Sequence, residues 1–236
     1  MNLPPDALAR QRAATTTVWR ADVRTRPGGA AAQLRDVAVH TTGIAVVHWN
    51  GAHVTGPDPD LVATRDWFAE RAMPYGVLVP EDSDYDPGTP LVTTQRVMLR
   101  DLEDLPPVPD LAVRWDDAEG AAAVQQVAFD DELASAFVAP KLVNDACAVV
   151  TVYDGGAAST ATLVVVDGTA AVFGVGTLPT YRKRGLGRAA TLAVMHVARA
   201  RGCDLVYLNP SELGHGMYRS LGFVDAPGWR VHQPIL

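Results

Sequence analysis

Hydrophobic and polar positions follow two different periods along the chain, most clearly between residues 147 and 202. Three apolar runs suited to β-strands cover residues 147–153, 160–166 and 170–178. The runs are separated by Asp154-Gly155-Gly156 and Asp167-Gly168, and Asp-Gly pairs are typical of tight hairpin turns. The pattern therefore predicts an antiparallel meander of three strands.

An amphipathic helix should follow the meander after a short loop. Apolar residues recur there at helical spacing, as Leu186, Ala190, Ala193, Val194 and Val197. Gly202 suits the position just after a helix, where the backbone turns left-handed. We then expect a strand over residues 204–209, a short helix capped by Ser211, and a last strand over residues 229–236.

The segment before the meander predicts a strand over residues 111–115. Asp116 or Asp117 can cap a following helix that runs to about Phe129. Residues 101–111 hold three prolines and four acidic residues, and prolines resist both helices and central strands. We therefore place a domain boundary near Pro106, which divides the chain into residues 1–106 and residues 107–236.

The N-terminal half has a weaker pattern. The first 29 residues show little periodicity, and we assign them no function. Residues 43–55 predict a strand with Asn50-Gly51 as a hairpin turn, and Asp58 can cap a helix after it. Strands are expected over residues 75–80 and 91–99. The whole pattern predicts a mixed α/β (α+β) fold, with a mostly antiparallel sheet flanked by helices and a smaller N-terminal α/β half.

Composition narrows the class of protein. The chain has 236 residues, of which 48% are hydrophobic, so it can bury a substantial core. Its net charge of −7 argues against a nucleic-acid-binding surface, which needs an excess of Lys and Arg. The sequence has no signal peptide pattern and no apolar run long enough to span a membrane, so we expect a cytoplasmic protein.

Residue types that often hold metals are scattered in this sequence. Cys147 and Cys203 stand apart from each other and from any His cluster, which predicts small buried side chains rather than a disulfide or a metal site. His48 and His53 flank the expected hairpin turn, but two imidazoles without a third ligand favour a structural role over zinc binding. We therefore expect no metal.

The loop between the meander and its helix carries the clearest candidate chemistry. It consists of Arg182, Lys183, Arg184, Gly185, Leu186, Gly187 and Arg188. Glycines let backbone N–H groups turn inward, and the first turn of a helix leaves its N–H groups unpaired at the positive end of the helix dipole. Cations at this end oppose the dipole, so a bound anion explains them better than a solvated turn. The loop predicts a site for a phosphate or pyrophosphate.

Two motifs in this half resemble the GNAT superfamily of acyl-CoA N-acyltransferases. The family's loop pattern, Arg/Gln-x-x-Gly-x-Gly/Ala, is met by Arg182, Gly185 and Gly187 within TLPTYRKRGLG. About 25 residues further on, SELGHGMYRSLGF resembles a second family signature. It is met by Ser211, Gly214, Tyr218, Leu221, Gly222 and Phe223. The resemblance covers roughly residues 107–236, and the two motifs together in this order are a specific signal.

The resemblance implies a mode of coenzyme A binding. The pyrophosphate would lie on the backbone amides of residues 182–188. The pantetheine arm would lie along the preceding strand at Val175, Thr177 and Leu178, pairing like an added strand, and Asn209 could contact it. Gly174 and Gly176 fit a bulge or a close approach of the ligand in that strand. A backbone N–H there would polarise the thioester carbonyl.

The resemblance also implies a catalytic role for Tyr218, which matches the tyrosine that can protonate the departing thiolate. Family members often place a glutamate on the central strand as general base, whereas residues 169–178 contain no Asp, Glu or His. The base stays open among Asp130, Asp131, Glu132, His215 and groups of the N-terminal half. An amine with a lowered pKa would need only water.

The sequence therefore predicts an N-acetyltransferase that moves an acetyl group from acetyl-CoA to a primary amine of a small molecule. Two alternatives remain: a non-catalytic acyl-CoA-binding module, and a transferase for a different acyl-CoA. The N-terminal half has a similar order of elements without the glycine-cation loop, so we interpret it as a degenerate copy of the same fold. We expect a monomer or a homodimer.

Overall fold

The computed structural model describes residues 3–130 and 145–234. By their contacts, the residues form two compact units. The C-terminal unit comprises residues 1–14 and 98–225, and the N-terminal unit comprises residues 15–97 and 226–236. Strands β5 (Leu91–Asp101) and β11 (Val224–His232) each begin in one unit and end in the other. Because the chain crosses between the units more than once, the domain boundary near Pro106 remains a prediction.

The C-terminal unit contains most of the elements predicted with a clear period. They are β6 (Ala112–Trp115), α3 (Ala118–Ala128), β7 (Cys147–Tyr153), β8 (Ala157–Val166), β9 (Thr169–Thr177), α5 (Leu186–Ala200), β10 (Leu205–Leu208) and α6 (Glu212–Ser220). The first half of α1 (Ala7–Val23) also belongs to this unit. Its strands lie in the order β5-β10-β9-β8-β7-β6, with residues 98–101 of β5 at one end.

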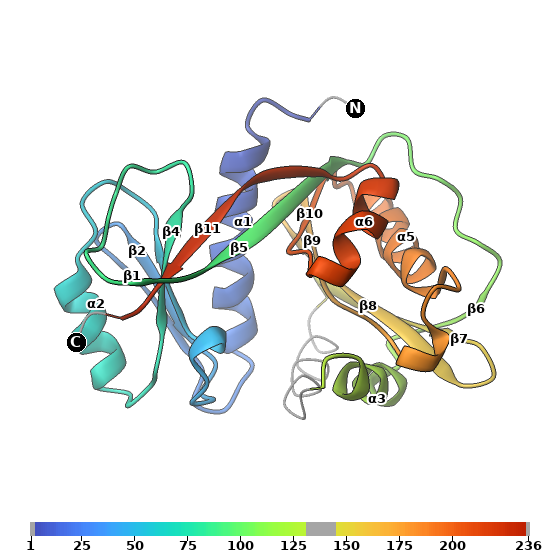
Figure 1. Ribbon diagram of the computed structural model, residues 1–236, viewed down its shortest axis with the longest axis horizontal. Coiled ribbons are helices and arrows are strands. Elements are labelled where there is room, and N and C mark those ends of the chain that lie inside the picture. The colour runs from blue at the N-terminus through green and yellow to red at the C-terminus, as the bar shows by residue number, and fades with distance from the viewer. Residues whose placement is uncertain (1–2, 131–144, 235–236) are drawn as a thin grey trace. The chain divides into compact units, whose positions relative to one another are not determined.

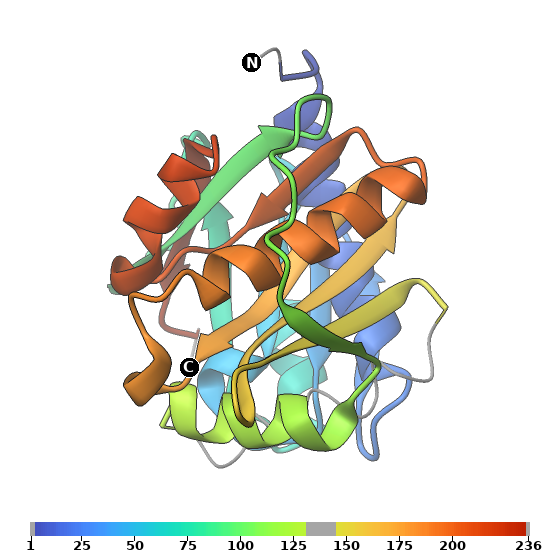
Figure 2. The same ribbon diagram turned by 90° about the vertical axis from the view of Figure 1, so that its right-hand side faces the viewer.

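Pairing in this sheet is antiparallel except between β9 and β10, which run parallel. The predicted meander of β7, β8 and β9 is thus confirmed. Alternate residues of a strand point to opposite faces. Val150 of β7 packs in the core that contains α5, whereas the neighbouring Val149 packs with Ala121 of α3. Helices α5 and α3 therefore cover opposite faces of the sheet (Figures 1 and 2).

Local turns and caps in this unit follow the sequence closely. Asp167 and Gly168 both have positive φ, 46° and 71°, in the hairpin between β8 and β9. Asp117, rather than Asp116, caps α3, because its Oδ1 accepts from the Gly120 N–H at 3.0 Å. Ser211 caps α6 in the same way, and Gly202 follows α5 with a φ of 84°.

The N-terminal unit is a second mixed sheet. It contains the second half of α1, β1 (Ala30–Leu34), β2 (Val37–Thr41), β3 (Gly51–Val54), α2 (Leu61–Ala69), β4 (Gly76–Pro80), the start of β5 and most of β11. The strands lie in the order β1-β2-β3-β4-β11; among the described residues β3 and β4 pair in parallel, and the other neighbours in this order are antiparallel. The strands predicted over residues 75–80 and 91–99 are confirmed as β4 and β5.

The two units repeat one arrangement of elements. In each, an antiparallel pair leads through a helix into a parallel strand: β2-β3-α2-β4 in the N-terminal unit and β8-β9-α5-β10 in the C-terminal unit. The next neighbour is antiparallel in both, and it comes from the other half of the sequence, β11 beside β4 and β5 beside β10. This topology agrees with the interpretation of the N-terminal half as a copy of the same fold.

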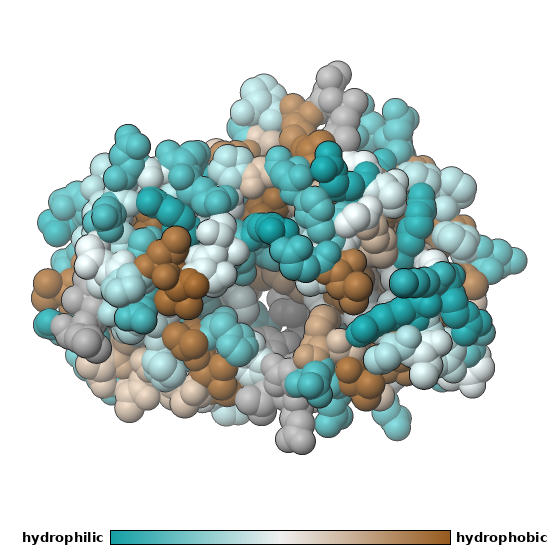
Figure 3. Space-filling model, viewed as in Figure 1, coloured by the Kyte–Doolittle hydropathy of each residue, from teal (hydrophilic) through white to brown (hydrophobic). Residues whose placement is uncertain are grey.

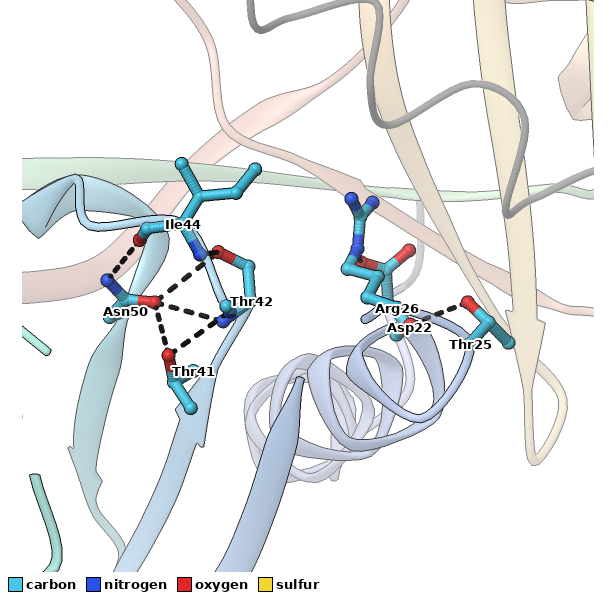
Figure 4. Close-up of polar contacts among 8 residues, drawn as sticks. Asp22, Thr25, Arg26, Thr41, Thr42, Ile44 and Asn50 are labelled. Atoms are coloured by element: carbon cyan, nitrogen blue, oxygen red, sulfur yellow. Dashed lines mark hydrogen bonds and ion pairs between the residues drawn. The ribbon is translucent and has the colours of Figure 1, made fainter. Parts of the chain in front are cut away.

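The prediction of a strand with a hairpin turn at Asn50-Gly51 is wrong. Asn50 is buried, and its side chain joins several backbone segments (Figure 4). Its Oδ1 accepts from Thr41 Oγ1 and from the Thr42 N–H, both at 2.9 Å. Its Nδ2 donates to the carbonyl oxygens of Ile44, Val46 and Pro74 at 2.9 to 3.0 Å. These partners hold residues 42–50 as a loop, which a local turn signal cannot reveal.

Two further expectations for this half need correction. Helix α2 begins at Leu61 with Asp60 as its cap, not with Asp58, since Asp60 Oδ1 accepts from the Ala63 N–H at 2.9 Å. The first 29 residues include α1, whose buried stripe mixes Ala14 and Val18 with the polar Gln11, Thr15 and Asp22. Polar residues in the buried stripe conceal the helical period. Near its end, Arg26 Nε donates to Asp22 at 2.7 Å, and both side chains are buried (Figure 4).

Candidate functional site

The C-terminal part of β9 departs from regular pairing on both of its edges. On the β8 side, Thr162 pairs with Phe173 and Thr160 with Gly176, so two residues, Gly174 and Val175, lie opposite Ala161. This is a β-bulge, and Gly174 adopts a φ of 57° that suits glycine. The bulge predicted from Gly174 and Gly176 is confirmed.

On its other edge, β9 is paired only in part. The parallel ladder with β10 ends at the pair Leu208 and Val172, and within the described chain no β10 residue pairs with residues 173–177. Asn209 and Pro210 follow β10 at this point, and Asn209 is exposed. The backbone of Val175 and Thr177 therefore faces an opening in the sheet where an extended ligand could add as a strand.

The predicted anion loop leads from this open edge into α5. Leu178 precedes a 3-10 turn over Pro179–Tyr181, and Lys183 and Gly185 have positive φ, 60° and 80°. Gly185 occupies the N-cap of α5, and among the described residues no side chain caps the helix. By contrast, α2, α3 and α6 are each capped by their own Asp or Ser side chain. The first-turn N–H groups of α5 are thus available to an anion.

The cations of the loop differ in their contacts. Arg182 donates from Nε to the Thr177 carbonyl at 3.3 Å and from Nη2 to the Ala128 carbonyl at 3.4 Å. Arg184 pairs with Asp154 of the β7–β8 turn and lies 5.3 Å from the centre of the Tyr181 ring. Hydrophilic residues predominate on the face of this unit that carries α6 and the start of α5 (Figure 3). Arg182 and Arg184 thus already contact groups of the protein, and Lys183 and Arg188 are the other cations of the loop.

Gly187, in the first turn of α5, lies against the end of β9. A Cβ at this position would sit 3.0 Å from Thr177 Oγ1 and 3.6 Å from Met217 Sδ of α6. Ser159 of β8 completes the group, with its Oγ 2.9 Å from Thr177 Oγ1. Sequence reasoning missed Ser159, because only the register between β8 and β9 reveals it as the partner of Thr177.

Tyr218 lies on α6 and is buried, with 6% of its surface exposed. Its ring packs edge-on to Phe223 and against Gly214, where an added Cβ would come within 2.9 Å of the ring. Burial raises the pKa of Tyr218 to about 12. The phenol therefore keeps its proton at neutral pH, which a proton donor requires.

The candidates for a general base have separate positions. His215 Nε2 lies 2.7 Å from Asp225 Oδ1, and its side chain is 25% exposed. Asp130 is exposed just after α3. Asp131 and Glu132 lie outside the described residues. The base remains unassigned among these groups.

The loop of the N-terminal unit that corresponds to residues 178–187 carries acidic residues in place of basic ones. It joins β3 to α2 with the sequence TGPDPD over residues 55–60. Asp60 caps α2, and Arg35 Nη1 lies 3.4 Å from Asp58 Oδ2. The Asp60 carboxylate therefore lies at the N-terminus of α2, whereas among the described residues no side chain caps α5. This disfavours a second anion site of the same kind in the N-terminal unit.

The described residues show neither a metal centre nor a membrane-spanning helix. Within residues 3–130 and 145–234, no three His, Cys, Asp or Glu side chains are grouped so that they could hold a metal ion. Over the same residues, no helix is both long and apolar enough to cross a bilayer.

Comparisons with known proteins bear on the family and the fold of this chain. The sequence model of the Acetyltransferase (GNAT) family matches residues 110–223. A search of curated proteins finds no match. Among solved structures, a GCN5-related N-acetyltransferase from Kribbella flavida is 23% identical with a TM-score of 0.71, and 95% of each chain is covered.

Two further solved structures share the fold over most of the chain. A conserved protein of unknown function from Staphylococcus epidermidis is 13% identical with a TM-score of 0.66, covering 88% of this chain and 95% of that one. A tandem GNAT protein from the clavulanic acid biosynthesis pathway is 14% identical with a TM-score of 0.56, covering 92% of this chain and 88% of that one. At these identities the likeness shows the fold alone.

Proposed function

We propose that this protein is an acyltransferase that moves the acetyl group of acetyl-CoA to a primary amine of a small molecule, since residues 110–223 match the sequence model of the Acetyltransferase (GNAT) family. Acyl transfer from an acyl-CoA follows from the family. We propose further that the acyl group is acetyl, that the acceptor is an amine, and that the residues named below form the site.

The observation that carries the proposal is the continuous path from the open edge of β9 to the uncapped start of α5. Backbone groups of Val175, Thr177 and Leu178 along the open edge would hold the pantetheine arm. Residues 182–188, with the N–H groups of Gly185, Leu186 and Gly187 among them, would hold the pyrophosphate. An extended, flexible arm that ends in a pyrophosphate matches both parts of this path.

The chemistry would proceed by direct attack of the amine nitrogen on the thioester carbon. The N–C bond forms, the carbonyl oxygen becomes an oxyanion, and a backbone N–H near Val175 stabilises that charge. The C–S bond then breaks, and Tyr218 donates a hydrogen bond, and finally its proton, to the departing thiolate of coenzyme A. The amine loses its extra proton to a base or to water, and a proton returns to Tyr218, so that the proton balance closes.

The pKa of Tyr218 limits what this residue can contribute. A phenol with a pKa of about 12 is a weaker acid than a thiol, whose pKa is about 8.5. Full proton transfer is therefore uphill, and stabilisation of the developing thiolate by a hydrogen bond would be the larger part of its role. We expect the effect of Tyr218 to be moderate for this reason.

The acceptor is a primary amine in this proposal, and the net charge of −7 attracts cationic amines. To test the activity, acetyl-CoA is incubated with the protein and a panel of small amines, and its consumption is measured through the free thiol of the coenzyme A released. Acetylated product identified by mass spectrometry would support it. Tight acyl-CoA binding without transfer to any amine would instead support a binding module. Faster transfer from a longer acyl-CoA would mean that the donor is that acyl-CoA and not acetyl-CoA.

A further inference from the structure

A buried hydroxyl group, that of Ser159, and a half-buried one, that of Thr177, are linked at the end of β9. Ser159 of β8 lies directly opposite Thr177 in the strand register. Its side chain is fully buried, and its Oγ donates to the carbonyl oxygen of Gly176 at 2.7 Å. The same Oγ lies 2.9 Å from Thr177 Oγ1, a hydrogen-bond distance.

The number of hydroxyl hydrogens determines which group donates in each of these hydrogen bonds. A serine hydroxyl has one hydrogen to donate and two lone pairs that accept. Because the Gly176 carbonyl can only accept, the hydrogen of Ser159 is used there. The hydrogen between the two hydroxyls must then come from Thr177. Thr177 Oγ1 is left with its lone pairs, and it can only accept a bond from any further group.

Thr177 occupies the point where the open edge of β9 meets the start of α5. Gly187 is so close that an added Cβ would lie 3.0 Å from Thr177 Oγ1. If coenzyme A binds along this path, its pyrophosphate and its pantetheine arm meet near here. A pyrophosphate offers only acceptor oxygens, which the lone pairs of Thr177 would repel. A pantetheine arm offers amide N–H donors, which those lone pairs would attract.

We propose that Thr177 accepts a hydrogen bond from an amide N–H of the pantetheine arm, and that Ser159 is the positioning residue that fixes this polarity. The inference rests on the proposed function, since it assumes that coenzyme A is bound. It assigns the Thr177 side chain to recognition of the arm and not of the phosphates. Ser159 acts only through Thr177 and Gly176.

Titration calorimetry with two ligands tests the inference. Coenzyme A has the arm, whereas adenosine 3′,5′-bisphosphate has phosphates without the arm. The variants are Thr177→Val, Thr177→Ser, which keeps the hydroxyl, and Ser159→Ala. Thr160→Val is the matched control, because Thr160 is also a buried hydroxyl of β8 that donates to a carbonyl oxygen, that of Val150 at 2.8 Å.

We expect Thr177→Val to raise the Kd of coenzyme A by about threefold to tenfold, the range of one neutral hydrogen bond. Ser159→Ala should raise it in the same direction, and Thr177→Ser should restore binding to near that of the unchanged protein. The Kd of adenosine 3′,5′-bisphosphate should stay within about twofold in all variants. Circular dichroism and the Tm of each variant show whether it is folded.

Three results would overturn the inference in different ways. An equal rise in Kd for both ligands would mean that Thr177 donates to a phosphate. An unchanged Kd of coenzyme A in a folded Thr177→Val protein would mean that the hydroxyl makes no bond to the ligand. If the unchanged protein binds neither ligand, the proposed function fails and this inference fails with it.

Discussion

His53 gives a sharp prediction about how stability depends on pH. Its side chain is 2% exposed, and among the described residues neither ring nitrogen has a hydrogen-bond partner. The ring lies 5.4 Å from that of His40, which stacks on Trp19, and 5.0 Å from that of Trp229, all within the N-terminal unit. Burial lowers the pKa of His53 from 6.5 to about 4.

Linkage between protonation and folding determines whether stability rises or falls with pH. The folded protein resists protonation of His53, whereas the unfolded chain takes up the proton at about pH 6.5. Stability is therefore complete above that pH and is lost as the pH falls through the interval down to about 4. Each tenfold difference in proton affinity corresponds to about 1.4 kcal/mol, so His53 alone costs about 3 kcal/mol at pH 4. Burial and the charge of His53 lower the pKa of His40 as well, which adds to the loss.

The assay is urea unfolding at pH 7.5 and at pH 4.5, followed by tryptophan fluorescence. Four of the five tryptophans, Trp19, Trp49, Trp67 and Trp229, belong to the N-terminal unit, so fluorescence reports mainly on it. We expect His53→Phe, which keeps an aromatic ring beside Trp229, to reduce the acid-induced loss by about 2 to 3 kcal/mol. His48→Gln is the control, because His48 is exposed. An equal loss in the His53→Phe protein and the unchanged protein would refute the reasoning.

Three more predictions concern the candidate site. Tyr218→Phe should lower kcat by about tenfold to a hundredfold, at or below the low end of acid-base effects, and leave the Kd of acetyl-CoA unchanged. Equal rates for both proteins would remove its catalytic role. Gly187→Ala should weaken acetyl-CoA binding, measured by calorimetry, because the added Cβ would lie 3.0 Å from Thr177 Oγ1. The control Gly216→Ala should bind acetyl-CoA normally, because a Cβ there has no atom within 4 Å among the described residues. Asp154→Asn should strengthen binding by up to about threefold, since it frees Arg184 from a competing carboxylate in a partly exposed pair; weaker binding in that variant would show that the pair supports the loop instead.

The sequence predicted most of the C-terminal unit because its signals are local there. The meander consists of three apolar runs, and its turns carry glycine at positions with positive φ such as Gly168. Helix α5 has a clear apolar face. The glycine-cation loop could likewise be predicted, since Gly185, Gly187 and the cations around them lie within seven consecutive residues, 182–188.

The rest depends on contacts between residues far apart in the sequence. Asn50 resembles a turn residue, but its amide binds the carbonyl of Pro74, 24 residues further on. Ser159 acquires its partners from a register that the bulge at Gly174 shifts. Helix α1 was missed because its buried face contains Gln11 and Asp22. The exchange of β5 and β11 between the units is equally non-local, and no pattern within either strand indicates it.

Calorimetric titration of the full chain with acetyl-CoA tests the central claim most directly. The path along β9 into α5 is the one site proposed, since in the corresponding loop of the N-terminal unit Asp60 caps α2 and Asp58 pairs with Arg35. We therefore predict one acetyl-CoA bound per chain, with weaker binding at high salt because the loop cations contribute. Absence of heat at millimolar ligand, or two equivalent sites per chain, would contradict the account.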